Sequence, residues 1–451
     1  MSASRKIDLS LVRPIYRLTT PVFLGSQLEN LINLVDIYMV GRLGVDAMSA
    51  VGIATTLTMV IRITMVAVTS GGFTLVAQAI GAGDPHHASS TAKQSLTLVA
   101  LVSLVFALLG IALSAPALDF LSPSHAVAEL GLPFLQVFFV GLVFIAINYV
   151  IQNCLYGAGD TRTPLYLSLL NSIVKLIASY GLIFGAWGLP TLGIVGAAVG
   201  TIIGQIAGLV AGMWALYSGR FALSLLPATS YRPDRELASR ILTIGIPAGL
   251  QGIFRNGSNI LFVKFLALTQ NPVAAVAAYT VGSQIERFLR RGSLSFGTAA
   301  QTLVGQRIGA GDIPQAERYG WTTILVGPLS MLLMGLPLAL LGKPYMHLFT
   351  TEVEVVRIGV AYLWAICLAE PFMALAIASG GGLRGAGDTK PALNYTLIAQ
   401  WLVRLPASYL LAFALGLDTD GLWIGLVVVS AVQGALTVRR YAGGAWKAMK
   451  V

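Results

Sequence analysis

Charged residues are scarce in this chain. Aspartate, glutamate, lysine and arginine make up 11% of its 451 residues, whereas a soluble domain carries about 25%. Hydrophobic residues make up 56%, and the mean hydropathy is +0.78. Apolar stretches long enough to cross a bilayer recur along the whole length. The composition therefore excludes a soluble globular protein and predicts one integral membrane unit.

Residues that form disulfides or bind metals are also few. The two cysteines, Cys154 and Cys367, lie in apolar stretches, which predicts two free buried thiols. Four scattered histidines give no metal-site spacing. No nucleophile motif or phosphate-binding loop is present. We therefore expect no cofactor, no metal and no enzyme activity.

The tetrapeptide Gly-Ala-Gly-Asp occurs four times, beginning at residues 81, 157, 309 and 385. The copies within each half are 76 residues apart (157 − 81 and 385 − 309), and the halves are offset by 228 (309 − 81). This regularity indicates a duplicated structure, and in a membrane protein it favours a two-lobed transporter. In each turn we expect a glycine to end one helix in the left-handed conformation and the aspartate to begin the next segment.

Twelve membrane spans are predicted. They cover residues 14–42, 50–80, 92–115, 128–156, 164–187, 191–217, 238–268, 275–308, 318–342, 355–384, 391–415 and 421–440. The expected fold class is an all-α integral membrane protein with two six-helix lobes related by pseudo-two-fold symmetry. The N-lobe is predicted over 1–217 and the C-lobe over 237–451, with the polar segment 218–236 as the linker.

Basic residues gather on one side of these spans. They occur near the N-terminus, in the linker, after the Gly-Ala-Gly-Asp turns and at the C-terminus, whereas the opposite loops carry mainly acids such as Asp119 and Glu352. The positive-inside rule then places both termini and the linker in the cytoplasm of a multi-pass protein of the inner (plasma) membrane. The net charge of +10 is explained by orientation against anionic lipid rather than by nucleic acid. We expect a monomer.

Several polar residues fall at membrane depth, where ionisable side chains cost free energy and are functional candidates. Glu29, Asn33 and Asp36 are spaced i, i+4, i+7 in the first span, so they share one helix face. That face should point into the protein or a wet cavity, and the alternative is a structural polar seam between helices.

The duplication pairs several of the buried polar residues. At offsets of 226 to 229, the pairs are Glu29 with Arg255, Arg62 with Arg290, Asn171 with Gln400, and Lys175 with Arg404.

Cations outnumber acids in the predicted interior. The cations are Arg62, Lys175, Arg255, Lys264, Arg287, Arg290, Arg291 and Arg404, and the acids are Glu29, Asp36, Glu286 and Glu370, so 8 − 4 = +4. This excess favours a cavity that attracts anions, because guanidinium groups suit carboxylate or phosphate. Internal pairing is an equal alternative. Glu286 and Arg290 are an i, i+4 pair, Glu29 and Arg255 would bridge the lobes as a gate, and other arginines would extend to an interface.

Three motifs resemble a known family. The segment Asn33–Gly44, followed by Ala-Val-Gly at 50–52, resembles the first-span signature of the multidrug and toxic compound extrusion (MATE) transporters. Leu155–Thr161 and Leu383–Thr389 resemble the same family's turns after spans four and ten. The resemblance covers essentially the whole chain and places it in the multidrug/oligosaccharidyl-lipid/polysaccharide flippase superfamily. It implies a V-shaped pair of lobes that rock between inward-facing and outward-facing states, with export driven by H⁺ or Na⁺ entry.

The resemblance also implies an ion-coupling site. Asp36 sits where many members carry a coupling aspartate, and Asn171 and Thr201 match two further polar positions of that site. Two departures stand out. Lys175 replaces an aspartate four residues after the asparagine, and Arg255 replaces a glutamate eight residues after the seventh-span proline. One lobe therefore keeps half of its carboxylate pair, and the other lacks its acid site.

These departures shape the expected function. An ammonium beside Asp36 disfavours Na⁺ by like-charge repulsion, which favours a transmembrane H⁺ gradient. We expect an Asp36–Lys175 pair that opens when a proton binds Asp36 or an anion binds Lys175. The predicted activity is secondary active efflux of small organic molecules, with organic anions or zwitterions as well as or instead of cationic drugs. The alternative is a flippase for a lipid-linked anionic head group.

The candidate site residues form two sets. The ion-coupling set is Asp36, Asn171, Lys175 and Thr201, and the substrate-cavity set is Glu29, Asn33, Arg62, Arg255, Glu286, Arg290, Gln400 and Arg404.

Overall fold

The computed structural model describes residues 9–122, 124–226 and 230–449, without the side chains of 59–64. The long helices are α1 (Leu9–Gly41), α2 (Val45–Gly81), α3 (Pro85–Leu121), α4 (His125–Gly157), α5 (Arg162–Phe184), α6 (Ile194–Tyr217), α7 (Arg235–Leu266), α8 (Pro272–Gly309), α9 (Ile313–Leu340), α11 (Val353–Gly385) and α14 (Asp418–Ala442). The shorter ones are η1 (Ala186–Gly188), α10 (Gly342–His347), α12 (Lys390–Leu397), η2 (Ile398–Arg404), α13 (Leu405–Tyr409), η3 (Leu410–Ala414) and η4 (Ala445–Ala448).

Each predicted span coincides with a long helix, except that 391–415 is the continuous run of α12, η2, α13 and η3. Within the described part of the chain, nine helical stretches are long and apolar enough to cross a membrane. Helices α1, α2 and α8 are not among them, and α2 contributes only the shorter apolar stretches Val45–Thr58 and Met65–Gly81. Helices α1 and α8 carry several of the interior charges that the sequence singled out. The two cysteines are free and buried, as predicted.

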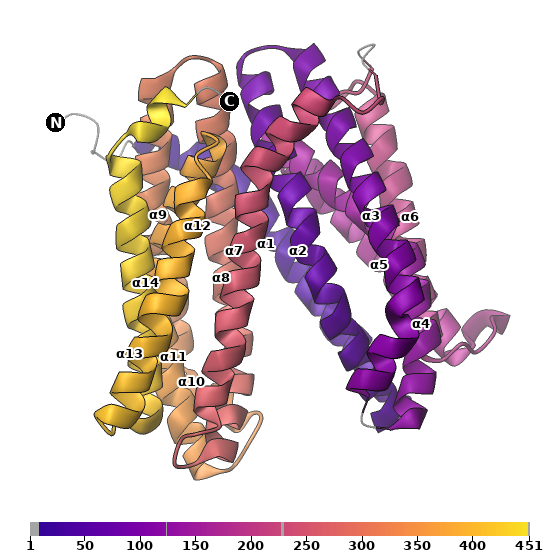
Figure 1. Ribbon diagram of the computed structural model, residues 1–451, viewed down its shortest axis with the longest axis vertical. Coiled ribbons are helices and arrows are strands. Elements are labelled where there is room, and N and C mark those ends of the chain that lie inside the picture. Colours follow the sequence, from indigo (N-terminus) through magenta and orange to yellow (C-terminus); the bar gives the residue numbers. More distant parts are fainter. Residues whose placement is uncertain (1–8, 123, 227–229, 450–451) are drawn as a thin grey trace. The chain divides into compact units, whose positions relative to one another are not determined.

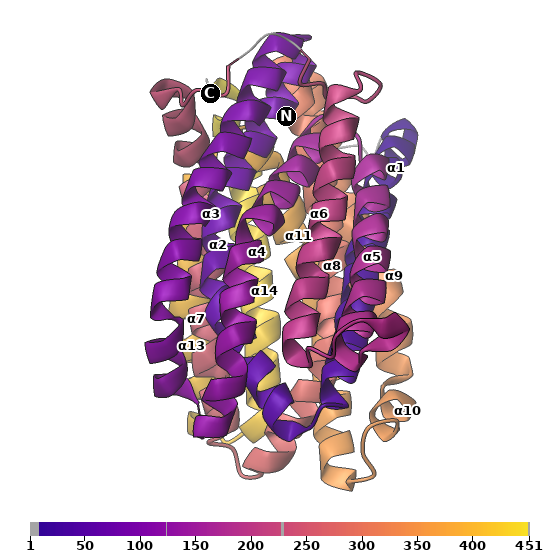
Figure 2. The same ribbon diagram turned by 90° about the vertical axis from the view of Figure 1, so that its right-hand side faces the viewer.

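The chain forms two compact units, Leu24–Gly249 and Met1–Phe23 with Leu250–Val451. For brevity we call them the first unit and the second unit. The chain passes between them inside α1 and α7, at positions 226 residues apart (250 − 24). The predicted lobe boundaries at 217 and 237 rest on the polar segment between them. The division into compact units does not test these boundaries, so they stay a prediction. In each unit the helices run lengthwise beside one another (Figures 1 and 2).

The start of α1 therefore packs in the second unit. Leu11 and Ile15 are buried in a cluster with Phe296 of α8. The hydroxyls of Tyr16 and Ser330 lie 2.6 Å apart. Burial of these apolar side chains stabilises this attachment of the N-terminal helix end.

A central helix organises each unit. Helix α4 contacts α2, α3 and α6 in the first unit, and α11 contacts α8, α9 and α14 in the second. A Cβ atom at Gly157 would lie 2.7 Å from the Phe73 carbonyl oxygen, and one at Gly385 would lie 2.5 Å from the Gln301 carbonyl oxygen. Both pairs are 228 residues apart (385 − 157 and 301 − 73), so glycine permits the same close helix crossing in both copies.

The four Gly-Ala-Gly-Asp turns have the predicted conformation. Their second glycines, Gly83, Gly159, Gly311 and Gly387, have φ of 69°, 84°, 74° and 83°. Asp84, Asp160 and Asp312 each accept a hydrogen bond from the backbone N–H three residues later. Asp388 instead accepts from Arg440 Nε at 2.8 Å and is 2% exposed, so this turn is tied to α14.

Candidate functional site

Helices α1 and α5 form an ion pair in the first unit. Lys175 Nζ contacts Asp36 Oδ2, and the two side chains are 16% and 20% exposed. Asp36 Oδ1 is buried and has no hydrogen-bond partner among the described residues. The predicted pair therefore forms, and it neutralises the ammonium while leaving one carboxylate oxygen available.

Helix α6 supports this pair through a glycine. A Cβ atom at Gly204 would lie 2.7 Å from Asn171 Oδ1 and 2.7 Å from Lys175 Cβ. Glycine thus allows α6 to lie directly against the part of α5 that carries both residues. The Thr201 hydroxyl donates to the Ala197 carbonyl at 2.9 Å, within its own helix. The structure therefore places Asn171 one turn from the ion pair on α5, whereas the Thr201 hydroxyl is used locally.

Two other candidates of this unit lie on the same helix as Asp36. Glu29 and Asn33 are exposed on α1. The side chain of Arg62, on α2, lies outside the described residues. Glu29 and Arg255 belong to different units, so the gate between them stays a prediction.

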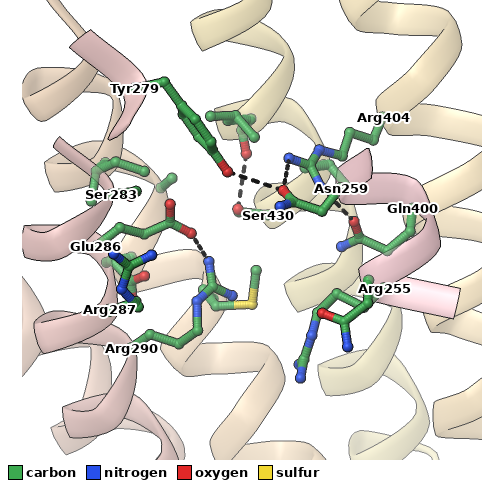
Figure 3. A pocket seen from close by; sticks show the side chains of 17 residues that line it. Arg255, Asn259, Tyr279, Ser283, Glu286, Arg287, Arg290, Gln400, Arg404 and Ser430 are labelled. Atoms are coloured by element: carbon green, nitrogen blue, oxygen red, sulfur yellow. Dashed lines mark hydrogen bonds and ion pairs between the residues drawn. The ribbon is translucent and has the colours of Figure 1, made fainter. Parts of the chain in front are cut away.

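A cavity of about 250 Å³ lies inside the second unit (Figure 3). Four arginines and two glutamates line it: Arg255, Arg287, Arg290, Arg404, Glu286 and Glu370. Six neutral polar side chains and five apolar ones also line it: Asn256, Asn259, Tyr279, Ser283, Gln400 and Ser430, and Ile366, Ala369, Met373, Leu426 and Val429. With every group ionised, the charged lining carries 4 − 2 = +2. All five predicted substrate-cavity residues of this half therefore share one cavity.

On the wall formed by α8, Glu286 neutralises one of the two lining arginines. Arg290 Nη2 forms an ion pair with Glu286 Oε1, and the two side chains are 26% and 16% exposed. The Tyr362 hydroxyl of α11 donates to the other oxygen of Glu286. The i, i+4 pairing considered from the sequence is thus present. Glu370, 2% exposed, accepts a hydrogen bond from Ser293 Oγ at 3.1 Å.

The opposite wall holds Arg404 among neutral groups. Its Nη1 donates to Gln400 Oε1 at 3.3 Å, and its Nη2 donates to Asn259 Oδ1 at 3.2 Å. Its Cζ lies 4.3 Å from the centroid of the Phe262 ring. The side chain is 6% exposed, and Nε is buried without a hydrogen-bond partner among the described residues. Figure 3 shows Arg404, Asn259 and Gln400 together, across from Glu286 and Arg290.

A widened turn carries Gln400 and Arg404. Residues Ile398–Arg404 form a π-helix, a feature frequent at functional sites. Pro406 follows, and in a regular α-helix its ring would clash with the carbonyl four residues earlier. The Gln400 carbonyl accepts a hydrogen bond from Ser258 Oγ of α7 at 2.9 Å. The Trp401 indole N–H donates to the Phe254 carbonyl at 3.0 Å. Two bonds to α7 therefore hold this irregular segment.

Arg255 lines the cavity and has neither a hydrogen bond nor an ion pair to any described side chain. Arg290 and Glu286 line the same cavity, so Arg255 lies among charges of both signs.

Sequence reasoning missed several lining residues. Asn259 was detectable, because it is the repeat counterpart of Asn33 (259 − 33 = 226). Arg287 and Glu370 were counted as interior charges but were not assigned to the cavity. Tyr279, whose hydroxyl donates to Asn259 Oδ1 at 3.1 Å, and Tyr362 had no distinguishing signal in the sequence.

Solved structures with this fold are membrane transporters. A mutant of the Vibrio cholerae MATE transporter VcmN matches with a TM-score of 0.87 and 24% identity, covering 96% of this chain and 97% of that chain. A MOP superfamily transporter from Pyrococcus furiosus matches with a TM-score of 0.85 and 21% identity, covering 97% and 96%. That transporter is described as having a binding pocket of reverse polarity that suggests a different function. The predicted all-helical fold class is confirmed.

The MatE family model matches residues 21–181 and 247–410, well over half of the chain. The chain belongs to the MATE family of transporters. Relatives include a probable multidrug resistance protein NorM of Thermotoga maritima, 26% identical over 96% of this chain and 93% of that protein. Another is the probable multidrug resistance protein NorM of Synechocystis sp., 27% identical over 92% of this chain and 91% of that protein.

Proposed function

We propose that this protein is a secondary active efflux transporter that works by alternating access and exports small organic anions or zwitterions as well as or instead of cationic drugs. The observation that carries the proposal is the cavity of the second unit, with four arginines against two glutamates. The names of the relatives, which are probable multidrug resistance proteins, support efflux as the activity.

The charge of the cavity favours anionic substrates. An unpaired charge in the membrane interior costs roughly 2.5–3.5 kcal/mol even on the lenient insertion scale, so an excess of cations is most stable when an anion or water balances it. Guanidinium groups match the planar geometry of a carboxylate. A Pyrococcus furiosus transporter with this fold is described as having a binding pocket of reverse polarity, which supports the view that pocket polarity differs among such transporters.

The membrane potential assists anion export. Expelling one negative charge from an inside-negative cell is favoured by ~2.3 kcal/mol per 100 mV. An exporter of anions therefore works with weaker ion coupling than an exporter of cationic drugs. We propose the orientation that the basic loops predict, with both termini in the cytoplasm.

We propose Asp36 as the centre of ion coupling, with H⁺ as the coupling ion. A proton on Asp36 removes the negative partner of Lys175, and because the pair is only 16–20% exposed, the released ammonium must find another anion or water. Na⁺ is disfavoured at the same place because the ammonium repels it. The contact between Asp36 and Lys175 supports this assignment.

Counterflow in proteoliposomes tests the substrate class. Vesicles preloaded with unlabelled 4-aminobenzoate should accumulate the labelled anion, and vesicles preloaded with tetraphenylphosphonium provide the cation arm. Exchange of the cation alone would contradict the proposed substrate class. Movement of a fluorescent phosphatidylglycerol between leaflets, without exchange of 4-aminobenzoate, would favour the flippase alternative.

A further inference from the structure

Two copies of one polar helix carry opposite charge. In α1 the residues are Glu29, Asn30, Asn33 and Asp36. In α7, at an offset of 226 (262 − 36), they are Arg255, Asn256, Asn259 and Phe262. Both asparagines are retained, while the two acidic positions have become an arginine and a phenylalanine. The duplication thus kept the polar pattern and removed its negative charge from one copy.

The cation that contacts each of these helices stands at an equivalent repeat position in the two units. In the first unit, Lys175 of α5 contacts Asp36 of α1. Its repeat counterpart Arg404 lies over Phe262, the counterpart of Asp36, with Cζ 4.3 Å from the ring centroid. The same positions therefore meet in both units. Lys175 is neutralised by a carboxylate, whereas Arg404 meets an aromatic face and two amide oxygens.

Arg404 still has unused hydrogen-bonding capacity. Its Nε–H is buried without a partner among the described residues, and each terminal nitrogen, bonded to one amide oxygen, has a second N–H. The guanidinium has five donors in a planar fork, and the N–H groups of Nε and one terminal nitrogen form an edge that donates to both oxygens of a carboxylate. Phe262 is 0% exposed and covers one face of the guanidinium. The ring does not cover the edges, where the N–H groups lie.

Resting on the proposed function, we propose that Arg404 is the substrate anchor and that it binds a planar carboxylate. The substrate's carboxylate takes the electrostatic role that Asp36 has toward Lys175. Arg290 is not the anchor, because Glu286 already pairs with it. A cavity of about 250 Å³ is below the roughly 300–1,000 Å³ of sites for drug-sized ligands, so it accommodates a small acid or the acidic end of a larger molecule.

The sharpest test restores the missing charge. Phe262→Asp gives Arg404 an internal carboxylate at the repeat position of Asp36, and this carboxylate competes with the substrate. Phe262→Asn is the matched control, because it removes the same ring and adds a side chain of the same size without the charge. Calorimetric titration of the purified full-length protein with 4-aminobenzoate measures binding, and 4-aminobenzamide serves as the uncharged ligand of similar shape.

We expect Phe262→Asp and Arg404→Gln to weaken 4-aminobenzoate binding by roughly 30-fold or more, as when one partner of a buried charge pair is lost. Phe262→Asn should stay within a few-fold of the wild type, and 4-aminobenzamide should bind far more weakly than the acid. Equal binding by Phe262→Asp and Phe262→Asn overturns the anchor, as does wild-type affinity in Arg404→Gln. Arg404→Gln leaves the Phe262 packing in place, so it decides the question even if Phe262→Asp does not fold.

Counterflow separates this inference from the function on which it rests. If the wild type exchanges 4-aminobenzoate and Arg404→Gln exchanges it equally well, anion transport stands and the anchor is wrong. If the wild type neither binds nor exchanges the anion, both the substrate class and the anchor are wrong.

Discussion

In the first unit a lysine meets a carboxylate, and at the same repeat positions of the second unit an arginine meets a phenylalanine. Helix placement is retained in both copies, from the glycine crossings to the Gly-Ala-Gly-Asp turns. The electrostatics differ, because one copy contains its own counter-ion. The comparison teaches that two copies with the same backbone can differ in side-chain charge, which is the basis of the proposed division between proton coupling in one unit and anion binding in the other.

The largest expected effect comes from removing the counter-ion in the first unit. Asp36→Asn should lower pH-gradient-driven accumulation by roughly 100-fold, near the upper end for a coupling free energy of about 1–3 kcal/mol between two sites. Counterflow, which needs no gradient, should persist. The measurement compares both modes in the same proteoliposomes, with the exposed Asp46→Asn as control. Intact gradient-driven transport in Asp36→Asn would refute the coupling role.

The next largest effect is expected at Gly204, the glycine that allows α6 to lie against α5 beside the ion pair. Gly204→Ala places a Cβ 2.7 Å from Asn171 Oδ1 and Lys175 Cβ, and such overpacking costs about 1–3 kcal/mol. Thermal unfolding of the purified protein should show the loss, together with weaker gradient-driven transport. Gly208→Ala is the control, because its added Cβ would lie 3.3 Å from Asn148 Oδ1, and the helix-propensity gain of roughly 0.5–1 kcal/mol offsets the tighter contact. Equal stability of the two variants would show that α6 does not position Lys175.

A third change sharpens the comparison inside the cavity. Glu286→Gln removes the counter-ion of Arg290, so the α8 wall should gain a second unneutralised arginine. We expect 4-aminobenzoate to bind up to about tenfold more tightly, which corresponds to roughly 1.4 kcal/mol. Tyr362→Phe, which removes a hydrogen bond to Glu286 but keeps its charge, is the control and should change affinity little. Weaker binding by Glu286→Gln would mean that the ion pair itself shapes the anion site.

The smallest effect concerns two equivalent turns. Asp388→Asn breaks the ion pair with Arg440 and should cost about 1 kcal/mol, since the Asp388 side chain is 2% exposed but that of Arg440 is 30% exposed. Its counterpart Asp160 (388 − 160 = 228) accepts backbone N–H groups at the start of α5. Asparagine preserves such capping, so Asp160→Asn should be nearly neutral. Thermal unfolding of both variants checks this, and a larger loss in Asp160→Asn would reverse the assignment.

Much of the fold was predictable because the bilayer imposes strong local constraints. Runs of apolar residues located a helical segment at each of the twelve predicted spans, and the repeat offset located the turns. The Glu286–Arg290 pair was also predictable, because residues four apart on a helix are neighbours whatever surrounds them. Contacts between helices far apart in the chain were not accessible in this way. The Tyr362 bond to Glu286 joins residues 76 apart, and no local pattern marks it.

The sequence by itself determined the helical membrane architecture, the duplication, the turn conformations and the excess of interior cations, because hydropathy, periodicity and charge are properties of the residues in order. Tertiary structure decided which cations are neutralised. Arg290 and Lys175 find carboxylates, whereas Arg404 lies against Phe262, Asn259 and Gln400. It also decided how the ends of α1 and α7 are shared between the two compact units. The physical reason is that the net effect of a buried charge depends on which groups helix packing brings within a few ångströms of it, and one chain order is compatible with many such arrangements.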